Sequence, residues 1–126
     1  MSTPDLSPEE QLRTMVVAYG DALGGELEPT GPRAGADSGD PRTSTLVLFE
    51  GHGVSVGVWE CTPGGWPIVD RSDTETMMLL RGAVTITPLG GEPVDLVEGD
   101  VFVLPRGWSG RWDVTETVRK LFVVAE

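Results

Sequence analysis

Three carboxylates lie close together in the sequence, at Asp70, Asp73 and Glu75, and they are the first residues that could carry chemistry. Carboxylate oxygens are the ligands that Mg²⁺ and Mn²⁺ prefer, and a carboxylate in a cavity can act as a general acid or base. The residues after Glu75 have the apolar pattern of a strand, whereas Asp70 falls in a predicted loop. We therefore expect no metal at these carboxylates and take Glu75 as the candidate acid/base residue.

The other reactive side chains are few. His52 is the only histidine, and it stands beside glycines in a predicted turn, where we expect it to be exposed. Cys61 is the only cysteine, so the chain cannot form an intramolecular disulfide, which fits a reducing compartment. It ends a predicted strand, and we expect it to pack as a small apolar side chain.

The composition predicts one domain rich in strands. A chain of 126 residues is long enough for a single core, and its 17 glycines and 10 prolines favour short strands joined by tight turns. The formal charge of −11 repels phosphate backbones and anionic lipid surfaces. We therefore expect no binding to nucleic acid or membranes. The N-terminus has neither the basic cluster nor the apolar run of a signal peptide, so we expect a cytoplasmic protein.

The N-terminal third has two predicted parts. Residues 7–23 have the pattern of an α-helix, in which Ser7 and Glu10 form a capping box and Gly24 ends the helix. Its apolar face consists of Leu12, Met15, Val16, Tyr19 and Leu23. This face would cover one side of the strand-rich domain or pack on a partner subunit. Residues 26–42 are rich in glycine and proline and predict a surface linker, with a lid over a pocket as the alternative. We place the domain boundary at residue 42.

From Thr43 to the C-terminus the pattern is that of strands. The segments with this pattern are 45–49, 54–61, 66–69, 75–82, 83–87, 93–97, 100–104, 110–114 and 118–124. Segment 54–61 alternates with period 2, but the sequence does not indicate which face is inside. Both faces of segment 75–82 are apolar, which is typical of a barrel or of a strand between two sheets. Because no helix pattern interrupts the run, we expect a mostly antiparallel all-β fold.

Four motifs in this region resemble those of a known family. Residues 99–107 have the spacing Gly-x5-Pro-x-Gly of the second cupin motif, and Glu75 and Gly82 match the Glu and terminal Gly of the first. Residues 57–64 and 112–120 add two further matches. From Thr43 onward the chain resembles the small single-domain cupins of the ureidoglycine aminohydrolase and ethanolamine-utilisation Q type. The resemblance implies a jelly-roll barrel whose cavity holds the active site, here with one N-terminal α-helix.

The resemblance also implies where a metal would be bound. Metal-binding cupins place two histidines before the motif Glu and a third after the final Gly of the second motif. In this sequence those places fall near Ile68, at Asp70 and at Gly110, so that Glu75 alone is kept. We therefore expect a metal-independent pocket without a cofactor, and not the iron or copper chemistry that needs imidazole ligands.

In a cupin the motif Glu points into the barrel, so the resemblance places Glu75 beside Met77 and Leu79. A carboxylate in such surroundings has to be protonated, hydrogen-bonded or paired with a cation. Three basic residues are candidate partners, namely Lys120, Arg111 and Arg119. The group is then either a buried structural ion pair or an acid/base catalyst, and we name Glu75 and Lys120 as candidate catalytic residues.

Four tryptophans in a chain with three phenylalanines indicate an aromatic pocket. The resemblance places Trp112 on the strand face of the missing third histidine and Trp108 at the pocket rim. The predicted substrate-binding residues are Trp59, Trp66, Asp70, Met77, Trp108 and Trp112. These side chains favour an apolar or aromatic organic ligand.

Three functions compete at this point. The first is a metal-independent pocket for a small organic molecule, with isomerisation, elimination or cyclisation by acid/base catalysis at Glu75. The second, implied by the resemblance, is a metal-dependent hydrolase of the ureidoglycine aminohydrolase type. The third is a non-catalytic ligand-binding or accessory module. Cupins commonly pair through their sheets, so we also expect a homodimer.

Overall fold

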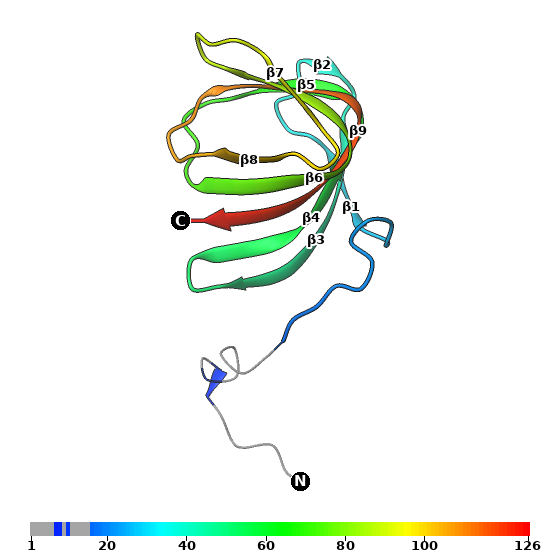
Figure 1. The fold of residues 1–126 in the computed structure, drawn as a ribbon, viewed down its shortest axis with the longest axis vertical. Helices are drawn as coiled ribbons and strands as arrows, with labels where there is room; N and C mark the ends of the chain where they lie inside the picture. The colour runs from blue at the N-terminus through cyan, green and yellow to red at the C-terminus, as the bar shows by residue number, and fades with distance from the viewer. Residues whose placement is uncertain (1–6, 9, 11–15) are drawn as a thin grey trace.

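A computed structural model of the chain describes residues 7, 8, 10 and 16–126, and these residues are almost entirely β (Figure 1). Nine strands lie within them, and all strand pairs are antiparallel. The strands are β1 (Glu28–Pro32), β2 (Ser38–Gly39), β3 (Arg42–Gly51), β4 (Val54–Cys61), β5 (Gly64–Ile68), β6 (Thr74–Pro88), β7 (Val94–Val97), β8 (Val101–Leu104) and β9 (Gly110–Ala125). The predicted all-β, antiparallel fold is confirmed.

The long strands β6 and β9 run through both halves of the barrel. The first part of β6 pairs with β8 and with the second half of β9, whereas its last part pairs with β7 and the first half of β9. In the same way, β9 pairs first with β5 and then with β4. Strands β3 and β1 extend one half, and β2 extends the other. Figure 1 shows that the resulting sheet curls back on itself.

A bend at Gly82 explains why two predicted strands are one. The pairing of β6 with β9 shifts register at three places between Leu79 and Val84. Gly82 lies there with φ of 84°, and a Cβ at this position would collide with the backbone carbonyl of Thr117 in β9. Glycine permits both the left-handed backbone and the close approach. Residues 75–87 therefore form one bent strand where the sequence pattern predicted two.

Alternation along the strands sends one set of side chains into the barrel. Trp59 and Cys61 of β4 face inward, which settles the face that the sequence left open. The core comprises Cys61, Trp66, Met77, Leu79, Val84, Ile86, Leu104, Trp112, Val114, Val118 and Phe122. On the opposite face of β6, Met78 is 38% exposed. The outer face of this apolar strand is therefore partly open to solvent in a single chain.

The predicted N-terminal helix is only partly supported. The capping box is present, because Ser7 N donates to Glu10 Oε2 at 3.1 Å and Glu10 N donates to Ser7 Oγ at 3.2 Å, and Pro8 and Glu10 are helical. Residues 16–23 are not helical, so the expected helix to residue 23 is wrong at its C-terminal end. Instead, Tyr19 Oη donates to the carbonyl of Glu26 at 3.0 Å. Residues 9 and 11–15, including Leu12 and Met15 of the predicted apolar face, lie outside the described residues.

The predicted linker, residues 26–42, contains two strands. Strand β1 pairs with β3, and β2 pairs with β5, so this segment is part of the sheet. Between β1 and β2, Asp37 accepts two hydrogen bonds from Arg111 at 2.7 and 2.8 Å, and Asp37 N donates to the Gly65 carbonyl at 3.0 Å. These contacts hold the loop after β1 against β9 and β5. The interpretation as a plain linker is therefore wrong, whereas the domain boundary at residue 42 stays a prediction.

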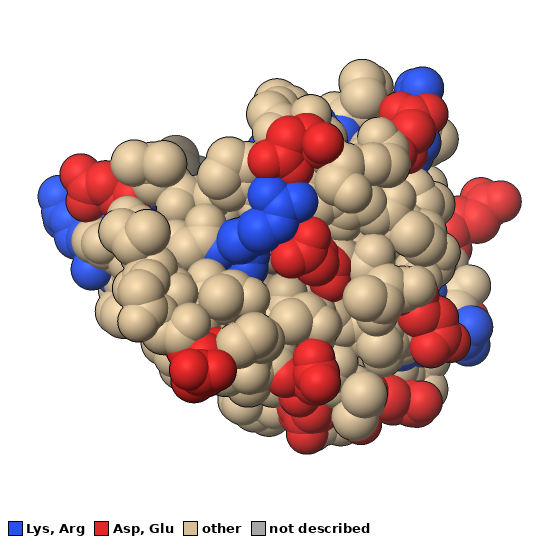
Figure 2. Space-filling model, turned by 90° about the horizontal axis from the view of Figure 1, so that it is seen from above, with Lys and Arg blue, Asp and Glu red and all other residues tan. Residues whose placement is uncertain are grey.

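Acidic side chains dominate the surface. On the face seen in Figure 2 they are spread over the molecule, and most of the few basic side chains lie next to an acidic one. Among the described residues, no helix has the length and apolarity that a membrane span requires.

Candidate functional site

A buried ion pair between Glu75 and Lys120 lies at the centre of the barrel. Lys120 Nζ donates to Glu75 Oε2 at 2.7 Å, and each residue is only 7% exposed. Glu75 lies on β6 and Lys120 on β9, and both belong to the inward-facing set of side chains. Of the three partners that the sequence offered, the structure brings Lys120 to Glu75.

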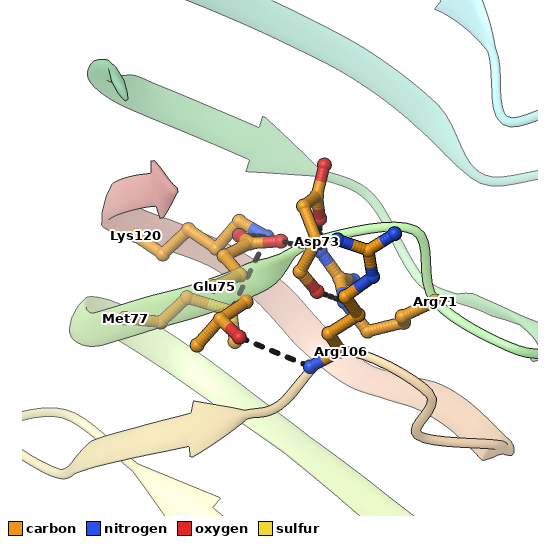
Figure 3. Close-up of polar contacts among 7 residues, drawn as sticks. Arg71, Asp73, Glu75, Met77, Arg106 and Lys120 are labelled. Atoms are coloured by element: carbon orange, nitrogen blue, oxygen red, sulfur yellow. Dashed lines mark hydrogen bonds and ion pairs between the residues drawn. The ribbon is translucent and has the colours of Figure 1, made fainter. Parts of the chain in front are cut away.

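Arg71 is a second cation at the same carboxylate, and it was not predicted from the sequence. Its Nη2 atom donates to Glu75 Oε1 and to Asp73 Oδ1, both at 2.9 Å (Figure 3). The loop between β5 and β6 carries Arg71, and backbone hydrogen bonds from Arg71 to Trp108 and from Gly107 to Arg71 fix it there. Only the tertiary path of this loop brings Arg71 to Glu75, and the spacing of the two residues in sequence gave no sign of it.

Arg111 and Arg119, the two other proposed partners, have different roles. Arg111 binds Asp37 and Asp113, as described above for the loop after β1. Arg119 is buried on the outer side of the barrel, where it donates hydrogen bonds to the carbonyls of Ala22 and Gly25. Both arginines therefore attach N-terminal segments to β9 and do not reach Glu75.

Aromatic rings surround the ammonium group of Lys120. Its Nζ atom lies 4.4 Å from the ring centroid of Trp59 and 4.6 Å from that of Trp112, both within the range of cation–π contacts. Met77 Sδ lies 3.5 Å from the same Nζ atom. Burial lowers the pKa of Lys120, and the negative charge of Glu75 opposes this shift. A buried ammonium whose pKa is lowered releases its proton more readily than a surface lysine does.

A cavity of about 240 Å³ opens onto this ion pair. Its apolar wall includes Trp59, Trp66, Trp112 and Phe122, and its polar wall consists of Arg33, Thr45, Arg71, Glu75 and Lys120. The volume is slightly below the range of roughly 300–1,000 Å³ that is common for drug-sized ligands, so the cavity suits a small metabolite.

The tryptophans form a fixed aromatic wall. Trp66 and Trp112 stack with centroids 5.7 Å apart and planes 15° apart, and Trp59 meets both rings edge-on at 6.2 and 6.0 Å. These are favourable geometries for aromatic pairs. The Nε1 atom of Trp112 is buried and has no hydrogen-bond acceptor within the described part of the chain.

The remaining predicted substrate-binding residues lie elsewhere. Met77 is fully buried beneath Lys120 and does not line the cavity, and Trp108 packs against the core from the loop after β8. Asp70 is exposed with φ of 49°, and its backbone N–H donates to Ser109 Oγ at 2.8 Å. The structure thus brings together Trp59, Trp66 and Trp112 with the ion pair, and leaves Asp70, Met77 and Trp108 outside the lining.

The two other reactive residues are also outside the site. His52 is exposed in the turn between β3 and β4 with φ of 53°. Cys61 is fully buried, and burial raises the pKa of its thiol to about 11. A thiol in this environment is unreactive at neutral pH.

The residues present do not fit the metal centre of the metal-binding cupins. Both oxygens of Glu75 are already engaged by cationic nitrogens, and Asp73 is paired with Arg71. Among the described residues, no group of three or more His, Cys, Asp or Glu side chains has an arrangement that could hold a metal ion. The motif carboxylate, Glu75, is therefore paired with two cationic side chains, those of Lys120 and Arg71.

A curled antiparallel barrel with an inward-facing motif glutamate defines the protein as a cupin. Residues 49–122 match the family model of the EutQ-like cupin domain, and the chain belongs to this family. No curated protein sequence matches the chain.

Solved structures agree with this assignment. A protein of unknown function from Pseudomonas syringae, of the DUF861 family, is 26% identical with a TM-score of 0.75, over 82% of this chain and 46% of its own. The chain thus spans about half of that protein. The EutQ protein of Clostridium difficile is 18% identical, with a TM-score of 0.60 over 68% of each chain. A cupin superfamily protein of Desulfitobacterium hafniense is 16% identical, with a TM-score of 0.56 over 66% of this chain and 76% of its own. The last two likenesses show the fold alone.

Proposed function

We propose that this cupin binds a small organic molecule in the cavity between the tryptophan wall and the Glu75–Lys120 pair. The observation that carries the proposal is that a buried ion pair lines an open, largely aromatic cavity. Protein interiors rarely keep a charged pair, because desolvation of the two ions makes it less favourable than a well-packed apolar pair. A ligand that contacts these charges gives the pair a role beyond packing.

Acid/base catalysis is the reaction type that suits these groups. Glu75 can accept a proton from a bound molecule, and Lys120, whose pKa burial lowers, can return one at the other end of the pair. Isomerisation, elimination and cyclisation all need such paired proton transfers and no redox cofactor. No step here requires a metal, and the hydrolase alternative lacks a donor set among the residues at the site.

Binding without catalysis is the second candidate, and one observation favours it. Arg71 and Lys120 together bind both oxygens of Glu75, so that a ligand's proton can reach only the lone pairs that these two bonds leave free. In an accessory module the same pair would only hold the ligand and keep the cavity in shape.

One experiment separates the two candidates. A library of small organic compounds is screened for binding by tryptophan fluorescence and then for turnover by NMR, with wild-type protein and with Glu75→Gln. Turnover that Glu75→Gln abolishes while affinity is retained supports the enzyme. Binding without turnover of any bound compound supports the accessory module. If no compound binds, the proposed function is wrong.

We also propose that two copies of the chain pair through the outer face of β8, β6 and β9. Four apolar side chains adjoin one another on this face, namely Met78, Val101, Val103 and Leu121. Met78 is paired with Val101 of β8 and with Leu121 of β9, and the neighbouring pair along the strands is Thr76–Val103. Val101 is 63% exposed and Val103 is 51% exposed. Two chains of charge −11 repel least where they meet through such a face.

Light scattering after gel filtration tests the pairing. The wild type should have the mass of two chains, and the variant Val101→Glu should have the mass of one. Leu89→Glu changes an apolar residue that is more exposed, at 81%, and lies in a turn, and it serves as control. A wild type that is monomeric at all concentrations would rule the pairing out. Location in the cytoplasm, and the absence of nucleic-acid and membrane partners, stay predictions from the sequence.

A further inference from the structure

The charges around the cavity differ from those of the whole chain. The chain has 9 basic and 20 acidic residues, yet three of the basic ones, Arg33, Arg71 and Lys120, line this one cavity. Among the described residues, Glu75 is the only carboxylate in the lining, and Asp73 adjoins Arg71 from outside it. Three cations against two carboxylates leave one positive charge in a small cavity of a strongly acidic protein.

Arg33 is the cation that leaves this charge unbalanced. Its guanidinium lies over the ring of Trp66, with Cζ 4.9 Å from the centroid, and its Nη1 atom donates to the Ala34 carbonyl at 2.6 Å. Within the described part of the chain it forms no ion pair with a carboxylate. Burial lowers the pKa of Arg33, and the nearby charge of Arg71 acts in the same direction. An anion beside Arg33 would relieve both effects.

The loop that carries Arg33 is attached at several points and is therefore a fixed part of the cavity. Arg33 N donates to the Pro41 carbonyl at 2.9 Å, and Asp37 is bound by Arg111 and by Gly65, as described above. Because both ends of the loop are bonded to the barrel, the guanidinium is held over the cavity before any ligand arrives. Such preorganisation reduces the ordering cost of binding.

We propose that the cavity is selective for a small planar organic carboxylate, whose charge faces Arg33 and Arg71 and whose planar part lies along the tryptophan wall. This rests on the proposed function of the cavity and adds the ligand class. A guanidinium presents two parallel N–H donors that match the two oxygens of a carboxylate, which favours this anion over a spherical one. The third cation, Lys120, remains paired with Glu75 and does not bind the carboxylate of the ligand, so it can take part in proton transfer.

The test uses probes that are matched in shape and differ in charge. Benzoate is compared with benzamide, and nicotinate with nicotinamide, by titration followed through tryptophan fluorescence and ligand-observed NMR. Each probe is titrated into wild-type protein, Arg33→Gln, Arg33→Lys and Arg42→Gln. Arg42 is an exposed arginine paired with Asp40 outside the cavity, so Arg42→Gln removes the same net charge elsewhere. Thermal melting of each variant checks that it is folded.

The expected result is at least tenfold tighter binding of each carboxylate than of its amide. Arg33→Gln should weaken carboxylate binding about tenfold and amide binding less than twofold, whereas Arg42→Gln should leave both unchanged. Arg33→Lys keeps the charge and loses the paired donors, so its affinity for the carboxylates should lie between that of the wild type and that of Arg33→Gln.

Two results would overturn the inference, and they are distinguishable. If the amides bind as tightly as the carboxylates, or if Arg42→Gln weakens binding as much as Arg33→Gln, the cavity still binds small molecules but does not select for the anion. If none of the four probes binds and the wider library also fails, the inference falls together with the proposed function.

Discussion

The two partners of the central ion pair should differ in how much their removal destabilises the protein. Lys120→Met leaves Glu75 bound to Arg71, so the change removes one hydrogen bond between charged groups, worth about 1.5–3 kcal/mol. Glu75→Gln leaves the ammonium of Lys120 buried between two tryptophans without a carboxylate, and removing one partner of a buried pair costs about 3–5 kcal/mol. Small domains have total stabilities of about 5–15 kcal/mol, so both effects are measurable.

Chemical denaturation followed by tryptophan fluorescence measures these free energies of unfolding. In the double variant Glu75→Gln/Lys120→Met no ammonium is stranded, so its cost should be smaller than the sum of the single costs by at least about 1 kcal/mol. Comparable slopes of the unfolding curves show that the same surface is exposed on unfolding in each variant.

Either of two results would contradict the predicted difference between Glu75 and Lys120. One is that Lys120→Met destabilises the protein as much as Glu75→Gln or more, since Arg71 would then not compensate Glu75. The other is additivity of the two changes within about 0.5 kcal/mol, since the two side chains would then not be coupled.

Three further outcomes are expected elsewhere in the barrel. Because burial raises the pKa of Cys61 from 9.0 to about 11, the unfolded chain releases this proton first; stability should therefore fall as the pH rises from 9 to 11, and Cys61→Ala should reduce that fall. Gly82→Ala should destabilise by about 2 kcal/mol or more through strain and collision, whereas Gly90→Ala, which meets no atom within 4 Å, should cost about 1 kcal/mol. Arg111→Gln should speed hydrogen exchange in the loop that carries Asp37, and unchanged exchange there would show that Arg111 does not hold this loop.

The sequence predicted the strands and both residues of the Glu75–Lys120 pair for physical reasons that the structure makes clear. Alternation with period 2 and the motif glycines depend on local geometry, so they are visible in the chain itself. Glu75 and Lys120 were both named, because the resemblance to cupins places Glu75 inside the barrel, where a carboxylate requires a cation, and Lys120 was one of three basic residues considered.

The two cavity arginines were out of reach of the same reasoning. Arg33 and Arg71 lie on loops, and bonds between distant segments determine where those loops run, such as Asp37 with Arg111 and Arg71 with Trp108. A pattern along the chain carries no information on such contacts. A high content of glycine and proline likewise suggested a linker where β1 and β2 pair with the sheet.

The end of the N-terminal helix was misjudged for a different reason. Helical periodicity continues to Leu23, but a short helix is stable in water only if its apolar face has a surface to pack on. Val16 is 94% exposed, so that face has no partner within the described part of the chain. Turn hydrogen bonds near Asp21 and Gly25 replace the helix there.

The indole N–H signals of the four tryptophans give the most direct test of the claim that this cavity is the functional site. A ¹H–¹⁵N correlation spectrum is recorded while small organic compounds are added, and the signals are assigned with Trp→Phe variants. Trp59, Trp66 and Trp112 line the cavity, whereas Trp108 does not and serves as an internal control. We predict that bound compounds shift the first three signals and leave that of Trp108 in place. If no compound shifts the three signals, or if Trp108 shifts as much as they do, the cavity is not the binding site.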